Sequence, residues 1–199
     1  GKNLLFAGGG AGSGRLTYKS LDPNEAQELH QFGTFINRSI QDWYVIDDKE
    51  FGDRQKGGTI DFVHLHPNAV SRASRQINGE KGLLWGKPLQ NKIYEHFTAG
   101  RYIKVEAFCD WMPTDNTFVS LDPKVKDKWA LPSAKVRVDV HLRNIQTGWY
   151  LANKSADVLK AMGAENVVSF AAGAPPTNLV AGGCRFGNDP ATSVLDKNC

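Results

Sequence analysis

Two segments in which apolar and polar side chains alternate constrain the fold of this chain more than any other feature. Residues 102–111 carry small or apolar side chains at every second position (Ile103, Val105, Ala107 and Cys109). Residues 135–143 repeat the pattern (Val136, Val138, Val140 and Leu142). A period of two is that of a β-strand with one buried and one polar face, which is typical of antiparallel sheets. The alternation therefore predicts an antiparallel sheet as the centre of the fold.

The remaining segments predict helices around this sheet. Asp22-Pro23 is typical of a helix start, and the helix is expected to run to about Phe32. A second helix is expected from Pro88 to Gly100, and a third from near Ser155 to Gly163, with Val158, Leu159 and Met162 on its inner face. Residues 59–65 indicate a further strand, and the turn at 113–116 predicts a hairpin that pairs 117–121 with 102–111. Because strands cluster without regular strand-helix alternation, the predicted class is α+β: a mainly antiparallel β-sheet backed by helices.

Length and charge narrow the possible partners. The chain has 199 residues, of which 41% are hydrophobic and 23% charged, and its formal net charge is +3. These values favour one globular domain, or one large and one small lobe, and no strong electrostatic attraction to nucleic acid or anionic lipid. The apolar runs are shorter than the ~20 residues that a membrane-spanning helix requires. Small molecules or proteins are therefore the expected partners.

The glycine-rich segment 8–14 resembles a phosphate-binding turn at first sight. It follows the apolar run 4–6, but its glycines do not have the Gly-x-Gly-x-x-Gly spacing. The residues after it, 15–18, predict a strand, whereas a phosphate-binding turn leads into a helix. We therefore predict a flexible or closely approached loop here in preference to a dinucleotide site.

Cysteines and histidines do not form a recognisable metal site. Cys109, Cys184 and Cys199 lack paired spacing, so three reduced thiols are expected. His64 and His66 could bind zinc only with a third ligand that the sequence does not identify, so no metal is predicted.

A candidate substrate-binding face lies on the predicted strand 135–143. His141 shares one face of that strand with Asp139 and Arg143, and a polar sheet face can line a substrate cleft. The alternative is an ordinary solvated face. No Gly-x-Ser-x-Gly elbow is present, and the residues alone show no complete catalytic set.

The C-terminal segment adds a resemblance to a known family. Gly182-Gly183-Cys184-Arg185-Phe186-Gly187-Asn188-Asp189-Pro190, followed by Ser193-Val194-Leu195-Asp196, resembles the C-terminal motif of the glucose-methanol-choline (GMC) family of FAD-dependent oxidoreductases. Residues 110–123, which end in Val119-Ser120-Leu121-Asp122-Pro123, look like a strand-turn-strand element of the same family. Residues 37–44 and 57–62 are similar to its sugar and polyol dehydrogenase branch.

The resemblance implies a cofactor, a reaction and a division of the chain. It implies FAD as cofactor, contacted by Gly182, Gly183, Cys184 and Arg185, and oxidation of a CH–OH group of an alcohol, sugar or polyol by hydride transfer to the flavin. Residues 1–174 would then form a substrate-binding α+β domain, and residues 175–199 a segment that returns towards the FAD-binding domain. On this interpretation the chain is a fragment that lacks most of the FAD-binding portion and is inactive when isolated. The electron acceptor is left open.

The expected catalytic position departs from the family pattern. The family's first catalytic histidine corresponds to Leu179, and a leucine cannot accept the hydroxyl proton. One hypothesis gives the neighbouring Asn178 a hydrogen-bonding role, with the base supplied by a missing C-terminal segment. The other holds that this branch has lost or relocated the usual pair.

Two functions of different classes thus remain open. The first is part of an FAD-dependent alcohol or sugar oxidoreductase. The second is a non-catalytic α+β binding module with no cofactor of its own. A Gly-x-Gly-x-x-Gly unit upstream in the reading frame would favour the first.

Overall fold

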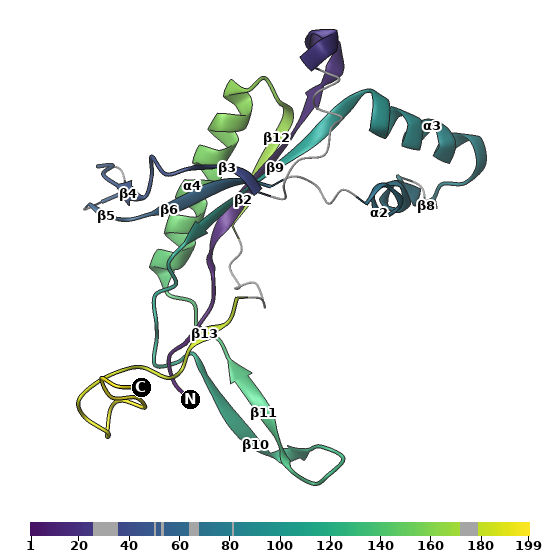
Figure 1. Cartoon of the computed structure of the whole chain (residues 1–199). Helices are drawn as coiled ribbons and strands as arrows, with labels where there is room; N and C mark the ends of the chain where they lie inside the picture. Colours follow the sequence, from purple (N-terminus) through teal and green to yellow (C-terminus); the bar gives the residue numbers. More distant parts are fainter. Residues whose placement is uncertain (26–35, 50, 53, 64–67, 81, 172–178) are drawn as a thin grey trace.

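The centre of the molecule is a five-stranded antiparallel sheet. The computed structural model describes all residues except 26–35, 50, 53, 64–67, 81 and 172–178. The strand order across the sheet is β12-β2-β9-β6-β3. These strands comprise Glu165–Ala171 (β12), Gly8–Thr17 (β2), Gly100–Cys109 (β9), Gly58–Val63 (β6) and Ile36–Ile40 (β3). Every neighbouring pair is antiparallel, which confirms the predicted α+β class (Figure 1).

One long helix covers one face of this sheet. Helix α4, Leu142–Ala161, lies along the face towards which the alternate β9 residues Val105 and Ala107 point (Figure 1). Leu151 and Leu159 of α4 are 0% exposed and belong to the same core cluster. The apolar half of the alternation in 102–111 is thus buried as predicted.

The glycine-rich segment 8–14 is a central strand, and the predicted loop was wrong. It forms most of β2, which pairs with β12 on one side and β9 on the other. A Cβ on Gly10 would lie 2.7 Å from the Gly148 carbonyl oxygen and 2.9 Å from the Ala152 Cβ. A Cβ on Gly12 would lie 3.1 Å from the Ser155 Cβ. The glycines therefore let α4 approach the backbone of the sheet closely.

The predicted hairpin partner was also wrong. Strand β10, Phe118–Lys126, pairs with β11, Pro132–Arg137, rather than with β9, and the two form a separate two-stranded sheet. The expected strand 135–143 therefore ends at Arg137. Val136 and Val138, predicted to be core, are 56% and 39% exposed, because no helix packs against this hairpin within the described part of the chain.

Helix α4 begins thirteen residues earlier than the predicted start near Ser155. The backbone becomes helical at Leu142 because His141 caps the first turn, its Nδ1 accepting a hydrogen bond from the Arg143 amide at 3.1 Å. The C-terminal end was predicted correctly: Gly163 has a φ of +79° and follows the last turn. Met162, however, is 43% exposed and does not line the core.

The other elements are shorter. Helix α3, Gly86–Thr98, confirms the predicted second helix, and α2, Ala69–Ser74, precedes it. Two 3-10 turns span Tyr18–Ser20 (η1) and Arg75–Ile77 (η2). Short strand pairs join Leu4–Leu5 (β1) to Ala181–Gly182 (β13), Val45–Ile46 (β4) to Gln55–Lys56 (β5), and Asn78–Gly79 (β7) to Gly82–Leu83 (β8).

Two sequence predictions fall partly outside the described residues. The expected start of the first helix is confirmed, because the Asn24 amide donates to Asp22 Oδ1 at 2.8 Å and the Glu25 carboxylate accepts from the Asp22 amide. Its continuation to Phe32 lies outside the described residues, as do His64 and His66. Among the described helices, none is long and apolar enough to cross a membrane.

Candidate cofactor and substrate site

The motif glycines lie against the N-terminal strand. Gly182 of β13 is opposite Leu4 of β1, and the Gly183 amide donates to the Asn3 carbonyl oxygen at 2.9 Å. Both glycines have positive φ, +77° and +82°. A Cβ on Gly182 would lie 2.3 Å from the Asn3 oxygen, whereas a Cβ on Gly183 would meet no described residue within 4 Å. Gly183 therefore presents open backbone that another group can approach.

The rest of the motif folds into a loop that closes on itself. The Arg185 carbonyl oxygen accepts hydrogen bonds from the Val194 and Leu195 amides, and Arg185 Nε donates to the Thr192 carbonyl oxygen at 2.7 Å. Asp189 shapes the turn by accepting from the Ala191 amide at 2.9 Å. Arg185 thus has a role inside its own loop, beside any role towards a ligand.

A cavity of about 630 Å³ opens in this loop. It is lined by the second half of the motif and the residues that follow (Gly187, Asn188, Pro190, Ser193, Val194, Leu195, Asp196, Asn198 and Cys199). Cys184, predicted to contact the cofactor, is exposed.

Leu179 is exposed beside this motif. Its side chain is 63% exposed and its backbone has a φ of +55°. A branched, apolar residue rarely adopts this left-handed conformation, which costs about 1 to 2 kcal/mol. Leu179 has no group that can accept a proton, and Asn178 lies outside the described residues.

Asp139 lies in the connection between β11 and α4, where the predicted strand does not continue. Its backbone is held by the fully buried Thr117, whose Oγ1 donates to the Asp139 carbonyl oxygen and accepts from its amide, both at 2.9 Å. The Thr117 carbonyl oxygen in turn accepts from the Leu4 amide at 3.2 Å. The Asp139 segment and the motif glycines therefore lie on two sides of the N-terminal strand.

His141 and Arg143 lie at the start of α4 and do not share a strand face with Asp139. The ring of His141 serves as the helix cap, and Arg143 Nε donates to Oε1 of Gln55 in β5. Within the described part of the chain, no hydrogen bond or ion pair joins these three side chains to Arg185 or to one another through side-chain atoms. The predicted strand was therefore wrong, while a substrate-binding role for Asp139, His141 and Arg143 stays a prediction.

Polar side chains also lie on the face of the five-stranded sheet opposite α4, next to the buried Ala11 and Val63. The register places Asp61 of β6 opposite Glu106 of β9, and Lys104 opposite Ser13 of β2. Since directly opposed residues of antiparallel strands share a face, these side chains lie together on the side away from the helix. The sequence signal was present, because Lys104 and Glu106 formed the polar half of the first alternating segment.

Hydrogen bonds connect neighbouring polar side chains on this face. Ser39 Oγ donates to Asp61 Oδ1 at 2.5 Å, and Lys104 Nζ pairs with Glu106 Oε1. Ser13 Oγ and the Tyr102 hydroxyl lie 3.2 Å apart. The face thus carries carboxylates, hydroxyls and an ammonium group, which can bind and orient the hydroxyls of a small polar molecule.

Cys109, at the end of β9, is unsuited to act as a nucleophile. Burial, together with the Asp110 carboxylate, raises the pKa of its thiol to about 11. Asp110 itself is paired with Lys56 at 2.8 Å, and the hydrogen bond between them raises the pKa of Lys56.

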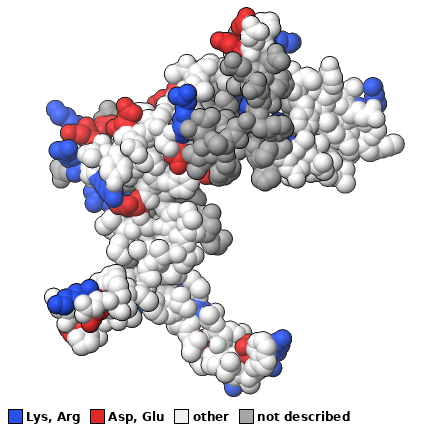
Figure 2. Space-filling view, viewed as in Figure 1, with Lys and Arg blue, Asp and Glu red and all other residues white. Residues whose placement is uncertain are grey.

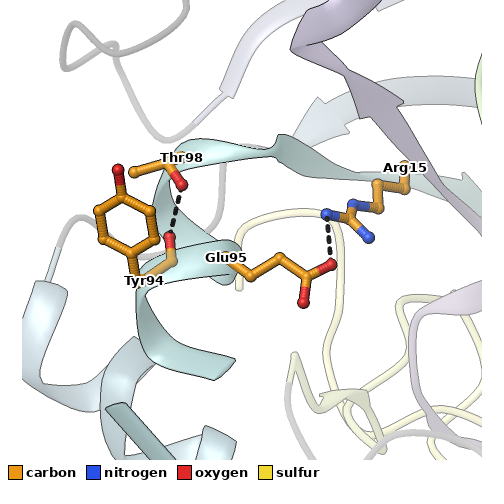
Figure 3. Close-up of polar contacts among 4 residues, drawn as sticks. All are labelled: Arg15, Tyr94, Glu95 and Thr98. Carbon is orange, nitrogen blue, oxygen red and sulfur yellow. Dashed lines mark hydrogen bonds and ion pairs between the residues drawn. The ribbon is translucent and has the colours of Figure 1, made fainter. Parts of the chain in front are cut away.

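Helix α3 is anchored to the other end of the sheet. Figure 3 shows Glu95 reaching from α3 to Arg15 of β2, with a separation of 3.9 Å, and Thr98 Oγ1 donating to the Tyr94 carbonyl oxygen at 2.8 Å. Burial and the neighbouring cations lower the pKa of His96. Among the described residues, no group of three His, Cys, Asp or Glu side chains could hold a metal ion.

Comparison with known proteins shows similarity to part of a dehydrogenase. No protein-family model matches the chain. It is 33% identical over 114 residues to a 2-methyl-1,2-propanediol dehydrogenase from Mycolicibacterium austroafricanum. The match covers 57% of this chain and 20% of that protein, so the chain spans about a fifth of its length.

That protein is named for a dehydrogenase activity, which comes to this chain only as a proposal. The narrower resemblance to the GMC family stays a prediction, as do FAD and the cofactor-contacting residues.

Proposed function

We propose that the chain is the substrate-side part of a longer oxidoreductase that oxidises a CH–OH group of a small alcohol, polyol or sugar. The observation that carries the proposal is the similarity to a protein named for dehydrogenation of a vicinal diol. The described chain supplies an antiparallel sheet with one face packed against α4, and the polar side chains of the other face are the proposed wall of the substrate cavity.

FAD is the proposed cofactor. The residues present are compatible with it at Gly183, whose missing side chain leaves open backbone, and at the guanidinium of the adjacent motif residue Arg185. These residues would contact FAD, and the rest of its binding site would come from the remainder of the full-length protein. When bound, FAD accepts a hydride from the substrate carbon.

The chain's own side chains would orient the substrate. Asp61 and Glu106 can accept hydrogen bonds from substrate hydroxyls, while Lys104 and Tyr102 can donate to them. A carboxylate that binds a hydroxyl discriminates strongly against analogues that lack it, because the buried partner is then left unpaired.

The hydroxyl proton needs an acceptor that Leu179 cannot provide. We propose that the base comes from the remainder of the full-length protein and that Asn178 donates or accepts a supporting hydrogen bond. Replacement of Asn178 by Ala in the full-length enzyme should then slow flavin reduction, and an unchanged rate would contradict this role.

The test is a dye-linked activity assay on the full-length protein with a panel of alcohols, diols and sugars. Active substrates are expected to be vicinal diols or polyols, and their methyl ethers should be inert. Glu106→Gln should raise KM about tenfold or more, the usual cost of a lost charged hydrogen bond, whereas Glu165→Gln, an exposed change on β12, should leave KM unchanged. If the two variants have equal KM values, the side chains of this sheet face do not contact the substrate.

A non-catalytic binding module is the second candidate, and Leu179 is the observation that favours it. A protein that contains no flavin and oxidises none of the panel, yet binds a polyol with an affinity that Glu106→Gln weakens, would support this alternative.

A further inference from the structure

The β10–β11 hairpin carries an apolar face that nothing in the described chain covers. Val119 is opposite Val136, and Leu121 is opposite Ala134, so these four side chains share one face. Leu121 and Val136 are 67% and 56% exposed, and the hairpin extends away from the five-stranded sheet (Figure 1). A two-stranded hairpin is marginally stable in water when it stands alone, so an exposed apolar face of this kind marks an interface.

The outer edge of β10 already accepts a strand at its beginning. The Gly1 amino group donates to the Val119 carbonyl oxygen at 2.7 Å, and the Val119 amide donates to the Gly1 carbonyl oxygen at 2.9 Å. Lys2 and Phe118 are bridged in antiparallel orientation. Residues 1 and 2 are therefore paired with β10 on the side opposite β11.

The next hydrogen-bonding position on this edge is Leu121. Along a strand, successive residues direct their amide and carbonyl groups to alternate sides, so Leu121 presents both groups on the same side as Val119. Neither group has a partner within the described part of the chain, since β11 pairs from the other side. Two residues further, Pro123 has no amide hydrogen, which limits the free edge to this short stretch.

The charged residues of the hairpin indicate what kind of surface would bind it. Between Phe118 and Arg137 the cations outnumber the acids by five to two (Lys124, Lys126, Lys128, Lys135 and Arg137 against Asp122 and Asp127). On the side drawn in Figure 2, blue and red side chains lie towards the far end of the hairpin. A second copy of the hairpin would bring like charges together, so the fitting surface is an apolar strip bordered by carboxylates.

We propose that, in the full-length protein, the residues directly before Gly1 continue along β10 as a third strand and that the polypeptide they belong to covers the apolar face of the hairpin. The inference rests on the proposed function, since it requires a full-length protein longer than this chain. The matched stretch of the dehydrogenase relative is 20% of its length, which leaves ample polypeptide to fill this role. In this register the residue immediately before Gly1 lies opposite Ser120, and the one before that lies opposite Leu121.

Residue-resolved hydrogen exchange on the full-length protein tests the proposal. The Leu121 amide should exchange about tenfold or more slowly than the amide of Lys128 in the hairpin loop, and protection should not depend on protein concentration or on added phosphatidylserine vesicles. Equal exchange of the two amides would overturn the proposal. Protection that appears only at high protein concentration would assign the face to a second copy, and protection that needs vesicles would assign it to lipid; either result overturns it.

A pair of variants on opposite faces of β10 provides the second arm. In the full-length protein, Leu121→Glu should abolish the protection of residues 119–121, whereas Ser120→Glu, one residue away on the polar face, should preserve it. If Leu121→Glu does not fold, the exchange of the unsubstituted protein still decides the question. None of these measurements involves flavin, so a colourless protein with a protected Leu121 would refute the proposed function and leave the interface standing.

Discussion

Strand β2 and the β10–β11 hairpin show opposite relations between residue type and burial. Half of strand β2 is glycine, yet it is an interior strand of the sheet, beneath α4. The hairpin carries valines and leucine on one face, yet that face is exposed. The difference teaches that burial here is decided by what packs against a strand. Small side chains on both partners let α4 approach β2, whereas the apolar face of the hairpin has no partner within the described residues.

Truncation of one apolar side chain in each region should give the largest difference in the free energy of unfolding. In the 199-residue chain, Leu159→Ala removes a fully buried side chain and should lower the free energy of unfolding by about 3 kcal/mol. Leu121→Ala on the hairpin should change it by less than about 0.5 kcal/mol. Urea denaturation measures both, and comparable losses would show that the hairpin face is buried.

Addition of a larger side chain in each region should give the next largest difference in stability. Gly10→Val places atoms within contact distance of Gly148 and Ala152 on α4 and should destabilise the chain by about 2 kcal/mol. Ala134→Val adds similar volume to the exposed hairpin face and should change stability by less than about 0.5 kcal/mol. A tolerated Gly10→Val would contradict the close contact between α4 and β2.

The junction between the two regions depends on Thr117. Thr117→Val removes both hydrogen bonds to the Asp139 backbone and leaves the Asp139 carbonyl oxygen with only the long contact from the Thr114 hydroxyl, so we expect the free energy of unfolding to fall by about 2 kcal/mol. Thr114→Val, which removes the 3.4 Å contact to the same carbonyl oxygen and the 3.2 Å contact between the two threonine hydroxyls but keeps the Thr117 bonds to Asp139, is the matched control. Thermal unfolding of the two variants should differ clearly, and equal midpoints would deny Thr117 this role.

The smallest expected effect is a difference in labelling rate between the thiols of Cys109 and Cys184. With a pKa of about 11, only about one Cys109 thiol in a thousand is ionised at pH 8, and its side chain is partly buried on the α4 side of the sheet. Its labelling should be slow and should accelerate as the pH rises towards 11, whereas the exposed Cys184 should react quickly. Mass spectrometry of peptides from the labelled protein separates the two, and rapid labelling of Cys109 at pH 8 would refute its burial.

Sequence reasoning succeeded where side chains report directly on their surroundings. The alternation in 102–111 identified β9 and its buried face, and capping residues identified the start at Asp22 and the end at Gly163. It failed at β2 because glycine has no side chain to show which face is buried. A signal existed there, since Gly10, Gly12 and Gly14 recur at a period of two, and Gly148, Ala152 and Ser155 form a row of small residues on α4.

The candidate site could be predicted only in part from the sequence. Valines at 136 and 138 suggested a buried strand that would carry His141 and Arg143 on its polar face, but the helix cap at His141 redirects the chain into α4. The sheet face that carries Asp61 and Glu106 depends on the pairing of β6 with β9, which no local pattern encodes. Neither this face nor the substrate-binding role first predicted for Asp139, His141 and Arg143 could be settled from the sequence.

The central claim is that the full-length protein oxidises an alcohol with FAD, and anaerobic absorbance spectroscopy tests it most directly. The purified full-length protein should show an oxidised flavin spectrum that bleaches when 2-methyl-1,2-propanediol or another active polyol is added, and the 199-residue chain alone should be colourless. A full-length protein that contains no flavin, or whose flavin spectrum is unchanged by every alcohol, diol and sugar of the panel, would contradict the claim.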